Sequence, residues 1–178
     1  MEARKGVRTL VEAAIDLLVR RGRTDASFLI CGNRNVDESR EYESMYTGMG
    51  IDQFIKFGGY RSDMVRLYQS CFCGVIPSSG WDSFPRTSLE MAASGLPVVA
   101  SRLGGLPEAV LEHKTGLLFE PGNAKQLADC LETLLDRPNL ASQYGQHGRA
   151  RCETGFSLEA QRKRFKAAIL KYMAREES

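Results

Sequence analysis

The sequence has no long hydrophobic run: no apolar stretch approaches the ~20 residues that a membrane-spanning helix needs. Its first residues also lack the apolar segment of a secretory signal peptide. The net charge is only +2, which is too small to indicate a nucleic-acid partner. Together these absences favour a cytoplasmic protein that neither spans a membrane nor binds nucleic acid.

Cysteine is scarce, and its spacing does not suggest pairs. The cysteines are Cys31, Cys71, Cys73, Cys130 and Cys152. An odd count without paired spacing favours reduced thiols and a cytosolic setting over a disulfide framework. Cys71 and Cys73 would share one face of a strand, but a metal site there lacks two further ligands. We therefore expect no bound metal.

Motifs of two other enzyme classes are also missing. No G-x-G-x-x-G follows a first strand, which argues against an NAD-binding domain. The two histidines, His113 and His147, lie outside the loops that we expect to form a site, so a nucleophilic hydrolase is not favoured.

Basic residues gather toward the two ends of the chain. They are Arg4-Lys5, Arg20-Arg21, Arg23, Arg162-Lys163-Arg164 and Lys166. Such clusters usually form solvated helix faces, and we favour that interpretation. The alternative is an edge that faces a partner or makes peripheral contact with the cytoplasmic face of a membrane.

The apolar content of 43% suffices for the core of one domain, and the pattern alternates strands with helices. Strands are predicted at 28–31, 54–57, 71–76, 97–100 and 116–119. Helices are predicted at 5–21, 37–49, 63–69, 85–95, 107–111, 124–135, 140–154 and 157–174, with Ser62 and Ser157 as caps. This alternation predicts an α/β, Rossmann-like fold with a parallel sheet and helices on both faces.

Such a sheet binds ligands beyond the carboxyl ends of its strands, where glycine and polar residues concentrate in this chain. The expected site loops are 32–34, 58–60, 77–84 and 101–105. Within the last, Gly104-Gly105 opens a helix, so backbone N–H groups can approach an anion such as a diphosphate. A simple turn is the alternative interpretation of that pair.

Asp82 and Glu90 are separated by eight positions, which places one carboxylate on a loop and the other on the following helix. Both can reach a shared pocket, and carboxylates accept hydrogen bonds from the hydroxyls of sugars and ribose. The alternative is that Asp82 belongs to a turn and Glu90 to a solvated helix face.

The order PS…D-x7-E…GLPVVAS…GGLPE…TGLLF…PGN resembles the carboxyl-terminal half of a family 4 retaining GT-B glycosyltransferase, of the glycosyl transferases group 1 type. Lys5-Gly6 resembles the start of that family's first helix, and Gly58-Gly59-Tyr60 resembles its base-flanking loop. The resemblance covers essentially the whole chain and implies one nucleotide-sugar-binding domain at 1–178.

The resemblance also implies the roles of individual residues. Glu90 would bind the ribose hydroxyls, Asp82 a hydroxyl of the donor sugar, and Lys5 the diphosphate. The donor-binding residues that it implies are Ser83, Phe84, Gly104, Gly105, Leu106, Gly32, Gly59 and Tyr60. No Asp-x-Asp motif is present, and the resemblance implies neither a metal nor another cofactor.

By this resemblance the intact enzyme transfers a hexosyl group from an NDP-sugar to an acceptor with retention. As a fragment without the acceptor domain, this chain alone is expected to bind the donor weakly and to be inactive in transfer. Asp82 replaces the family's glutamate, and Pro85, which has no N–H, replaces a glycine. A non-catalytic nucleotide-sugar binding module and an epimerase-like domain therefore stay open as alternatives.

The family's domain opens with an apolar strand, whereas only four residues precede Lys5 here. The expected fold is thus one half of a GT-B fold whose first strand, and whose amino-terminal acceptor domain, are missing from this chain. Helix 157–174 would cross back to that domain, which leaves its apolar positions (Leu158, Phe165, Ala168, Ile169, Tyr172) partly exposed.

Overall fold

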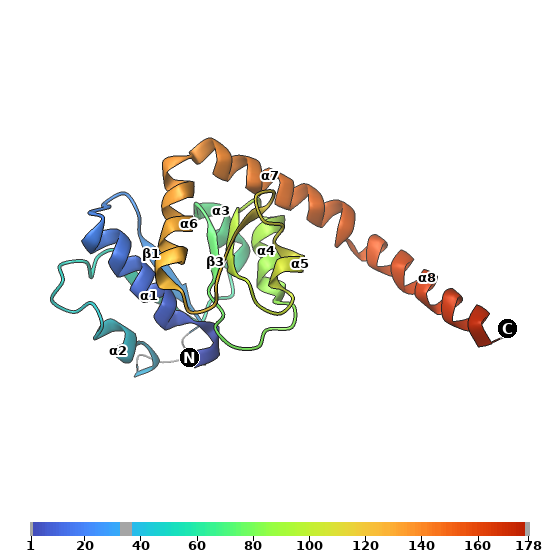
Figure 1. The fold of residues 1–178 in the computed structure, drawn as a ribbon, viewed down its shortest axis with the longest axis horizontal. Helices are drawn as coiled ribbons and strands as arrows, with labels where there is room; N and C mark the ends of the chain where they lie inside the picture. Colours follow the sequence, from blue (N-terminus) through green and yellow to red (C-terminus); the bar gives the residue numbers. More distant parts are fainter. Residues whose placement is uncertain (1, 33–36, 177–178) are drawn as a thin grey trace.

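The protein is an α/β domain with helices on both sides of parallel strands, as seen in a computed structural model that describes residues 2–32 and 37–176 (Figure 1). The elements are η1 Ala3–Lys5, α1 Val7–Ile15, η2 Asp16–Arg20, β1 Phe28–Cys31, α2 Asp37–Glu43, β2 Ile55–Gly59, α3 Met64–Ser70, β3 Gly74–Ile76, α4 Arg86–Ala93, β4 Val98–Ser101, α5 Leu106–Ala109, β5 Gly116–Phe119, α6 Ala124–Asp136, α7 Pro138–Gly155 and α8 Leu158–Glu176.

The strands form two parallel sheets, in the orders β1-β2 and β3-β4-β5. Phe28 lies opposite Ile55 in the first sheet, and Val98 lies opposite both Gly74 and Gly116 in the second. The predicted α/β class with parallel strands is confirmed. The sheet is divided in two because no strand of the described residues hydrogen-bonds to both β1 and β3.

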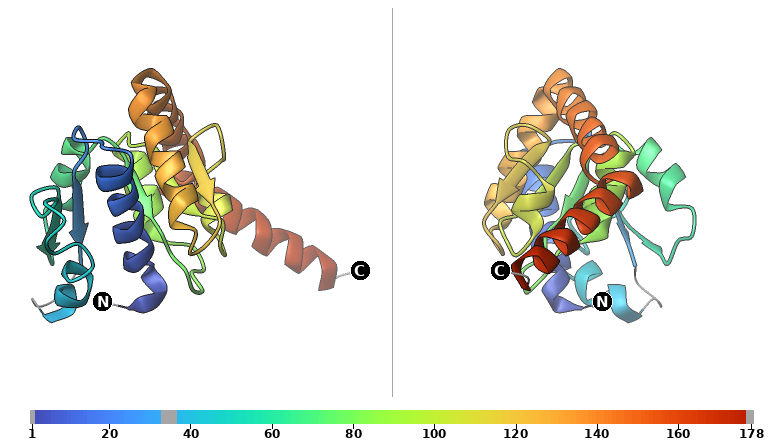
Figure 2. Two further views of the ribbon diagram at one scale, coloured as in Figure 1. Left: turned by 60° about the vertical axis from the view of Figure 1, so that its left-hand side comes forward. Right: turned by 90° about the vertical axis from the view of Figure 1, so that its right-hand side faces the viewer.

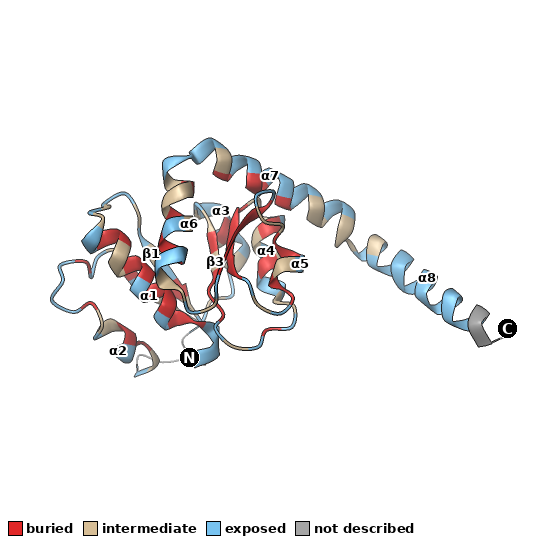
Figure 3. Cartoon of the chain, viewed as in Figure 1, coloured by how far each residue is buried: buried red, intermediate tan, exposed pale blue. Residues whose placement is uncertain are grey.

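The central strands are buried on both faces. Val99 of β4 joins a core cluster with residues of α1 and α6, whereas its neighbours Val98 and Ala100 join a second cluster with residues of α4 and α5. Figure 2 shows α1 and α6 side by side, and Figure 3 shows burial concentrated on the strands and the inward helix faces. The continuous apolar runs of the sequence therefore reflect two covered faces.

Three local predictions were wrong. The helix predicted at 37–49 ends at Glu43, and turns follow it. The strand predicted at 71–76 begins only at Gly74, whose N–H donates to the Pro97 carbonyl at 3.0 Å, so Cys71 and Cys73 lie ahead of the sheet. The cap of α3 is Asp63 and not Ser62, and the Asp63 carboxylate accepts from Arg61.

The cap predicted at the start of the last helix is confirmed. The N–H of Ala160 donates to Ser157 Oγ at 3.2 Å, which satisfies one of the unpaired donors of the first turn of α8.

The basic cluster near the end of η2 is neutralised within the molecule. Arg21 donates to Asp129 and Glu132 of α6, and Arg23 donates to Asp25 and Asp136. These pairs connect η2 to α6 and hold the pKa of both guanidinium groups above the ordinary value. This cluster is therefore not a free basic surface.

The last helix, α8, projects away from the body of the domain (Figure 1). Its exposed large apolar side chains are Leu158, Phe165, Ile169, Leu170, Tyr172 and Met173. The predicted exposure of its apolar positions is thus confirmed. Within the described residues, no helix has both the length and the apolar character needed to cross a membrane.

Candidate functional site

The segment before α1 packs directly on the loop between β3 and α4. The Arg4 carbonyl accepts from the N–H groups of Ser79 (2.8 Å) and Gly80 (3.1 Å), and Arg4 Nη1 donates to the Trp81 carbonyl (2.9 Å). Gly6 follows with a φ of +70°, and a Cβ built there would lie 1.6 Å from the Pro77 carbonyl oxygen. This contact between two backbones fixes Lys5 beside the loop.

Lys5 reaches Asp82, the loop carboxylate that the sequence singled out. Lys5 Nζ and Ser78 Oγ each donate to Asp82 Oδ2 at 2.9 Å. Asp82 is only 7% exposed and Ser78 is buried, whereas the Lys5 side chain is half exposed. The buried carboxylate therefore holds a partly exposed ammonium group in place.

The Gly104-Gly105 loop packs against the same stretch of backbone. A Cβ at Gly104 would lie 2.0 Å from the Asp82 carbonyl oxygen, and one at Gly105 would lie 1.9 Å from that of Ser83. The Gly105 N–H donates to the Asp82 carbonyl at 3.3 Å. The two loops that the sequence predicted separately are thus adjacent, and the contact requires glycine at both positions.

Two of the three backbone N–H groups at Gly104, Gly105 and Leu106 already donate to acceptors within the protein. Gly105 donates to Asp82 as described, and Leu106 donates to the Leu103 carbonyl at 3.0 Å. In the part of the chain that the structure describes, Gly104 is exposed and its N–H has no acceptor. Of these three residues, Gly104 is therefore the one whose N–H remains available to an anion.

Glu90 lies in the second turn of α4, as predicted, with a half-exposed side chain. Tyr68 of α3 donates its hydroxyl to Glu90 Oε2 at 3.5 Å, and Arg86 Nη2 lies 3.6 Å from Oε1. The structure gives Glu90 no direct contact with Asp82, so any shared role runs through a ligand.

The remaining predicted residues occupy different environments. The Gly32 N–H donates to the Gly59 carbonyl at 2.9 Å, which joins the ends of β1 and β2, and Tyr60 beyond them is 82% exposed. Residues 33 and 34 of the first predicted loop lie outside the described residues. The Leu106 side chain is fully buried, so it supports the loop from beneath.

The two residues that follow Asp82 differ in exposure. Ser83 is exposed, whereas Phe84 packs its ring against Phe156 with centroids 6.0 Å apart. Ser83 is therefore the more exposed of the pair, and Phe84 is half-buried.

Sequence reasoning assigned no role to Arg4, Ser78 or Tyr68. Ser78 belongs to the Pro-Ser motif, which is a signal that could have identified it. Arg4 acts largely through its backbone, and Tyr68 occupies an ordinary apolar position of a short helix, so neither residue carries a recognisable signal.

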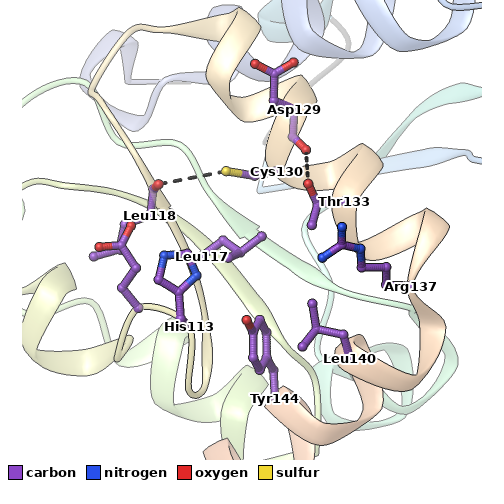
Figure 4. A pocket seen from close by; sticks show the side chains of 10 residues that line it. His113, Leu117, Leu118, Asp129, Cys130, Thr133, Arg137, Leu140 and Tyr144 are labelled. Atoms are coloured by element: carbon purple, nitrogen blue, oxygen red, sulfur yellow. Dashed lines mark hydrogen bonds between the residues drawn. The ribbon is translucent and has the colours of Figure 1, made fainter.

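A cavity of about 280 Å³ between β5, α6 and α7 contains none of the predicted site residues (Figure 4). His113 borders it, and both histidines are exposed and lie outside the strand-end loops, as expected. A second cavity of about 410 Å³ lies behind Phe84, between Glu108, Arg151 and Phe156.

The cysteines are free thiols, and burial raises the pKa of Cys73 to about 12 and that of Cys130 to about 11. Such thiols are poor nucleophiles at neutral pH. Residues 2–32 and 37–176 contain no cluster of three or more His, Cys, Asp or Glu side chains that could hold a metal ion.

Comparisons with known proteins point to one family. The profile described as Glycosyl transferases group 1 matches residues 1–137. A D-inositol 3-phosphate glycosyltransferase from Corynebacterium efficiens is 35% identical over 146 residues, which make up 80% of this chain and 34% of that protein. The chain thus spans about a third of the length of the curated relatives it matches.

Solved structures agree. A sucrose-phosphate synthase from Thermosynechococcus elongatus superimposes with a TM-score of 0.82 at 28% identity, over 98% of this chain and 44% of the other. The C-terminal domain of a glycosyl transferase group 1 family protein from Francisella tularensis gives a TM-score of 0.80 at 26% identity, over 89% of this chain and 83% of that domain.

Proposed function

We propose that this chain, which belongs to the glycosyl transferases group 1 family, binds a nucleotide-sugar donor at the site around Lys5, Asp82 and Glu90. It has the fold of the C-terminal half of a GT-B glycosyltransferase. We assign it to the retaining, family 4 type and to the cytoplasm. The hexosyl acceptor would be held by an amino-terminal domain, either on the same polypeptide or as a separate subunit.

One observation carries this proposal: Lys5, Asp82 and Gly104-Gly105, from three distant parts of the sequence, meet in one network. A fixed ammonium group beside a glycine loop suits the charge that develops on a departing diphosphate. During transfer the bond between the sugar C1 and the diphosphate oxygen breaks, an acceptor hydroxyl oxygen forms the new bond to C1, and the hydroxyl proton passes to the departing diphosphate.

The other residues would hold the two ends of the donor. The Glu90 carboxylate would accept hydrogen bonds from the ribose hydroxyls, and Gly59 at the end of β2 with the exposed Tyr60 would flank the base. The backbone at Ser83 and Phe84 would line the sugar pocket. No step needs a metal ion, because Lys5 and the loop supply the positive charge.

A non-catalytic binding module is the second candidate, and Asp82 favours it. Its Oδ2 already accepts from Lys5 and Ser78, so only Oδ1 is free to accept from a donor sugar. Pro85 precedes α4 without an N–H to offer. Hexosyl transfer by a complex with the acceptor domain would exclude the module, and donor isomerisation without an acceptor would support an epimerase-like domain.

We propose further that α8 contacts the acceptor domain. Within the described residues, the rest of this domain does not cover the exposed apolar side chains of α8. Its basic residues, including Arg162 and Lys163, could alternatively touch the cytoplasmic face of a membrane.

The single tryptophan provides a test, since Trp81 is 77% exposed and adjoins Asp82. We expect one of UDP, GDP and ADP, and its sugar conjugate, to change Trp81 emission saturably. Trp81→Phe should lose the signal but keep binding in a calorimeter. If none of the three nucleotides or their glucose and mannose conjugates binds by either method, the proposal is wrong.

A further inference from the structure

Tyr68 is the one buried residue of the short helix α3, and it is only 4% exposed. Its hydroxyl points to Glu90 Oε2 on the neighbouring helix at 3.5 Å, a long hydrogen bond. Among the described residues, no other group accepts from this hydroxyl. If the Glu90 side chain turned away, the buried Tyr68 hydroxyl would lose this hydrogen bond and be left without an acceptor.

The hydroxyl is a proton donor at neutral pH. Burial, followed by the neighbouring charge of Glu90, raises the pKa of Tyr68 to about 12. The phenol therefore keeps its proton and faces Glu90 Oε2 as a hydrogen-bond donor.

The two carboxylate oxygens of Glu90 are in different situations. Oε2 faces the buried hydroxyl of Tyr68, whereas Oε1 faces the 89% exposed side chain of Arg86 at 3.6 Å. An exposed pair one turn apart on a helix is worth little and exchanges readily with water. One oxygen is thus held from within the protein, and the other is left for a ligand.

We propose that Tyr68 is a positioning residue: its hydroxyl fixes the rotamer of Glu90 so that the carboxylate faces the ribose of a bound nucleotide. This inference rests on the proposed function and adds to it the residue that prepares the ribose contact. Its helix, α3, is the element that comes after β2 and Tyr60 in the chain.

A packing role alone would have a different signature. If Tyr68 only anchors α3, phenylalanine, which keeps the ring, should replace it without effect on any ligand. If the hydroxyl acts through Glu90, its removal matters only for a ligand that Glu90 contacts. The ribose hydroxyls therefore decide between the two roles.

The test measures the affinity of wild-type protein and variants by calorimetry for two ligands. The first is whichever of UDP, GDP and ADP binds this chain, and the second is its 2′,3′-dideoxy analogue. Tyr68→Phe should weaken the ribonucleotide about three- to tenfold, the range of one hydrogen bond, and leave the dideoxy analogue unchanged. Tyr46→Phe is the matched control: it removes another buried phenol, 3% exposed in the turn after α2, and should change neither affinity.

Equal losses for both nucleotides, or no loss for either, would overturn the role of Tyr68. Glu90→Ala, measured alongside, separates this failure from a failure of the proposed function. If Glu90→Ala weakens the ribonucleotide while Tyr68→Phe does not, the ribose contact stands without Tyr68. If Glu90→Ala has no effect on it, the ribose contact itself is wrong.

Discussion

Replacing Gly6 by alanine is expected to destabilise the domain by more than about 3 kcal/mol, the upper range for strain at one residue. Gly6 has a φ of +70°, and its Cβ would lie 1.6 Å from the Pro77 carbonyl oxygen and 2.6 Å from the carbonyl carbon. Both atoms belong to the backbone, so no side chain can move aside. The free energy of unfolding from urea titration measures the loss.

Gly22→Ala is the control for this substitution. Gly22 has a similar φ of +66°, but a Cβ there would meet nothing within 4 Å. Gly22→Ala should lower the free energy of unfolding only by the cost of placing alanine in the left-handed conformation, about 1 kcal/mol. Equal losses at the two positions would mean that the segment before α1 does not pack on the Pro77 to Trp81 loop as described.

Lys5→Met should have the second largest effect, and it should appear in two measurements. Removing the ammonium group leaves the buried Asp82 carboxylate with the Ser78 hydroxyl as its hydrogen-bond donor among the side chains described above. This should lower the stability by about 1–2 kcal/mol. It should also weaken nucleoside diphosphate binding about tenfold, because a charge beside the phosphates is lost.

A second substitution separates these two roles of Lys5. In Lys5→Met with Asp82→Asn, the buried charge is gone, so much of the stability should return while nucleotide affinity stays low. Lys125→Met, on α6, is the control and should change neither quantity. Recovery of nucleotide affinity in the double variant would show that Lys5 acts only by neutralising Asp82.

Much of the fold could be predicted from the sequence, because local patterns determine it. The apolar runs at 28–31 and 116–119 match β1 and β5 to the residue. Gly95, with a φ of +85°, ends α4 where the sequence indicated. The adjacency of Asp82 and Gly104-Gly105 followed from the rule that parallel strands gather their carboxyl ends at one edge.

The parts that could not be predicted depend on tertiary contacts. Cys71 and Cys73 continue an apolar run, yet the ladder begins at Gly74, where the Pro97 carbonyl becomes available. Asp82 was expected to face a sugar hydroxyl, and no local pattern reveals that Lys5, 77 residues away, takes one of its oxygens. The Tyr68 hydroxyl is equally invisible, because its ring satisfies the apolar pattern by itself.

The most direct test of the donor site is calorimetric titration of the selected nucleoside diphosphate into wild-type protein, Glu90→Ala and Glu153→Ala. Glu153 is a matched control, an exposed glutamate on α7 that pairs with Arg149 one turn away, as Glu90 pairs with Arg86. We expect Glu90→Ala to weaken binding about 10- to 100-fold, the range for hydrogen bonds to a charged group, and Glu153→Ala to leave it unchanged. Wild-type affinity in Glu90→Ala would contradict the account of this site as a nucleotide-sugar site.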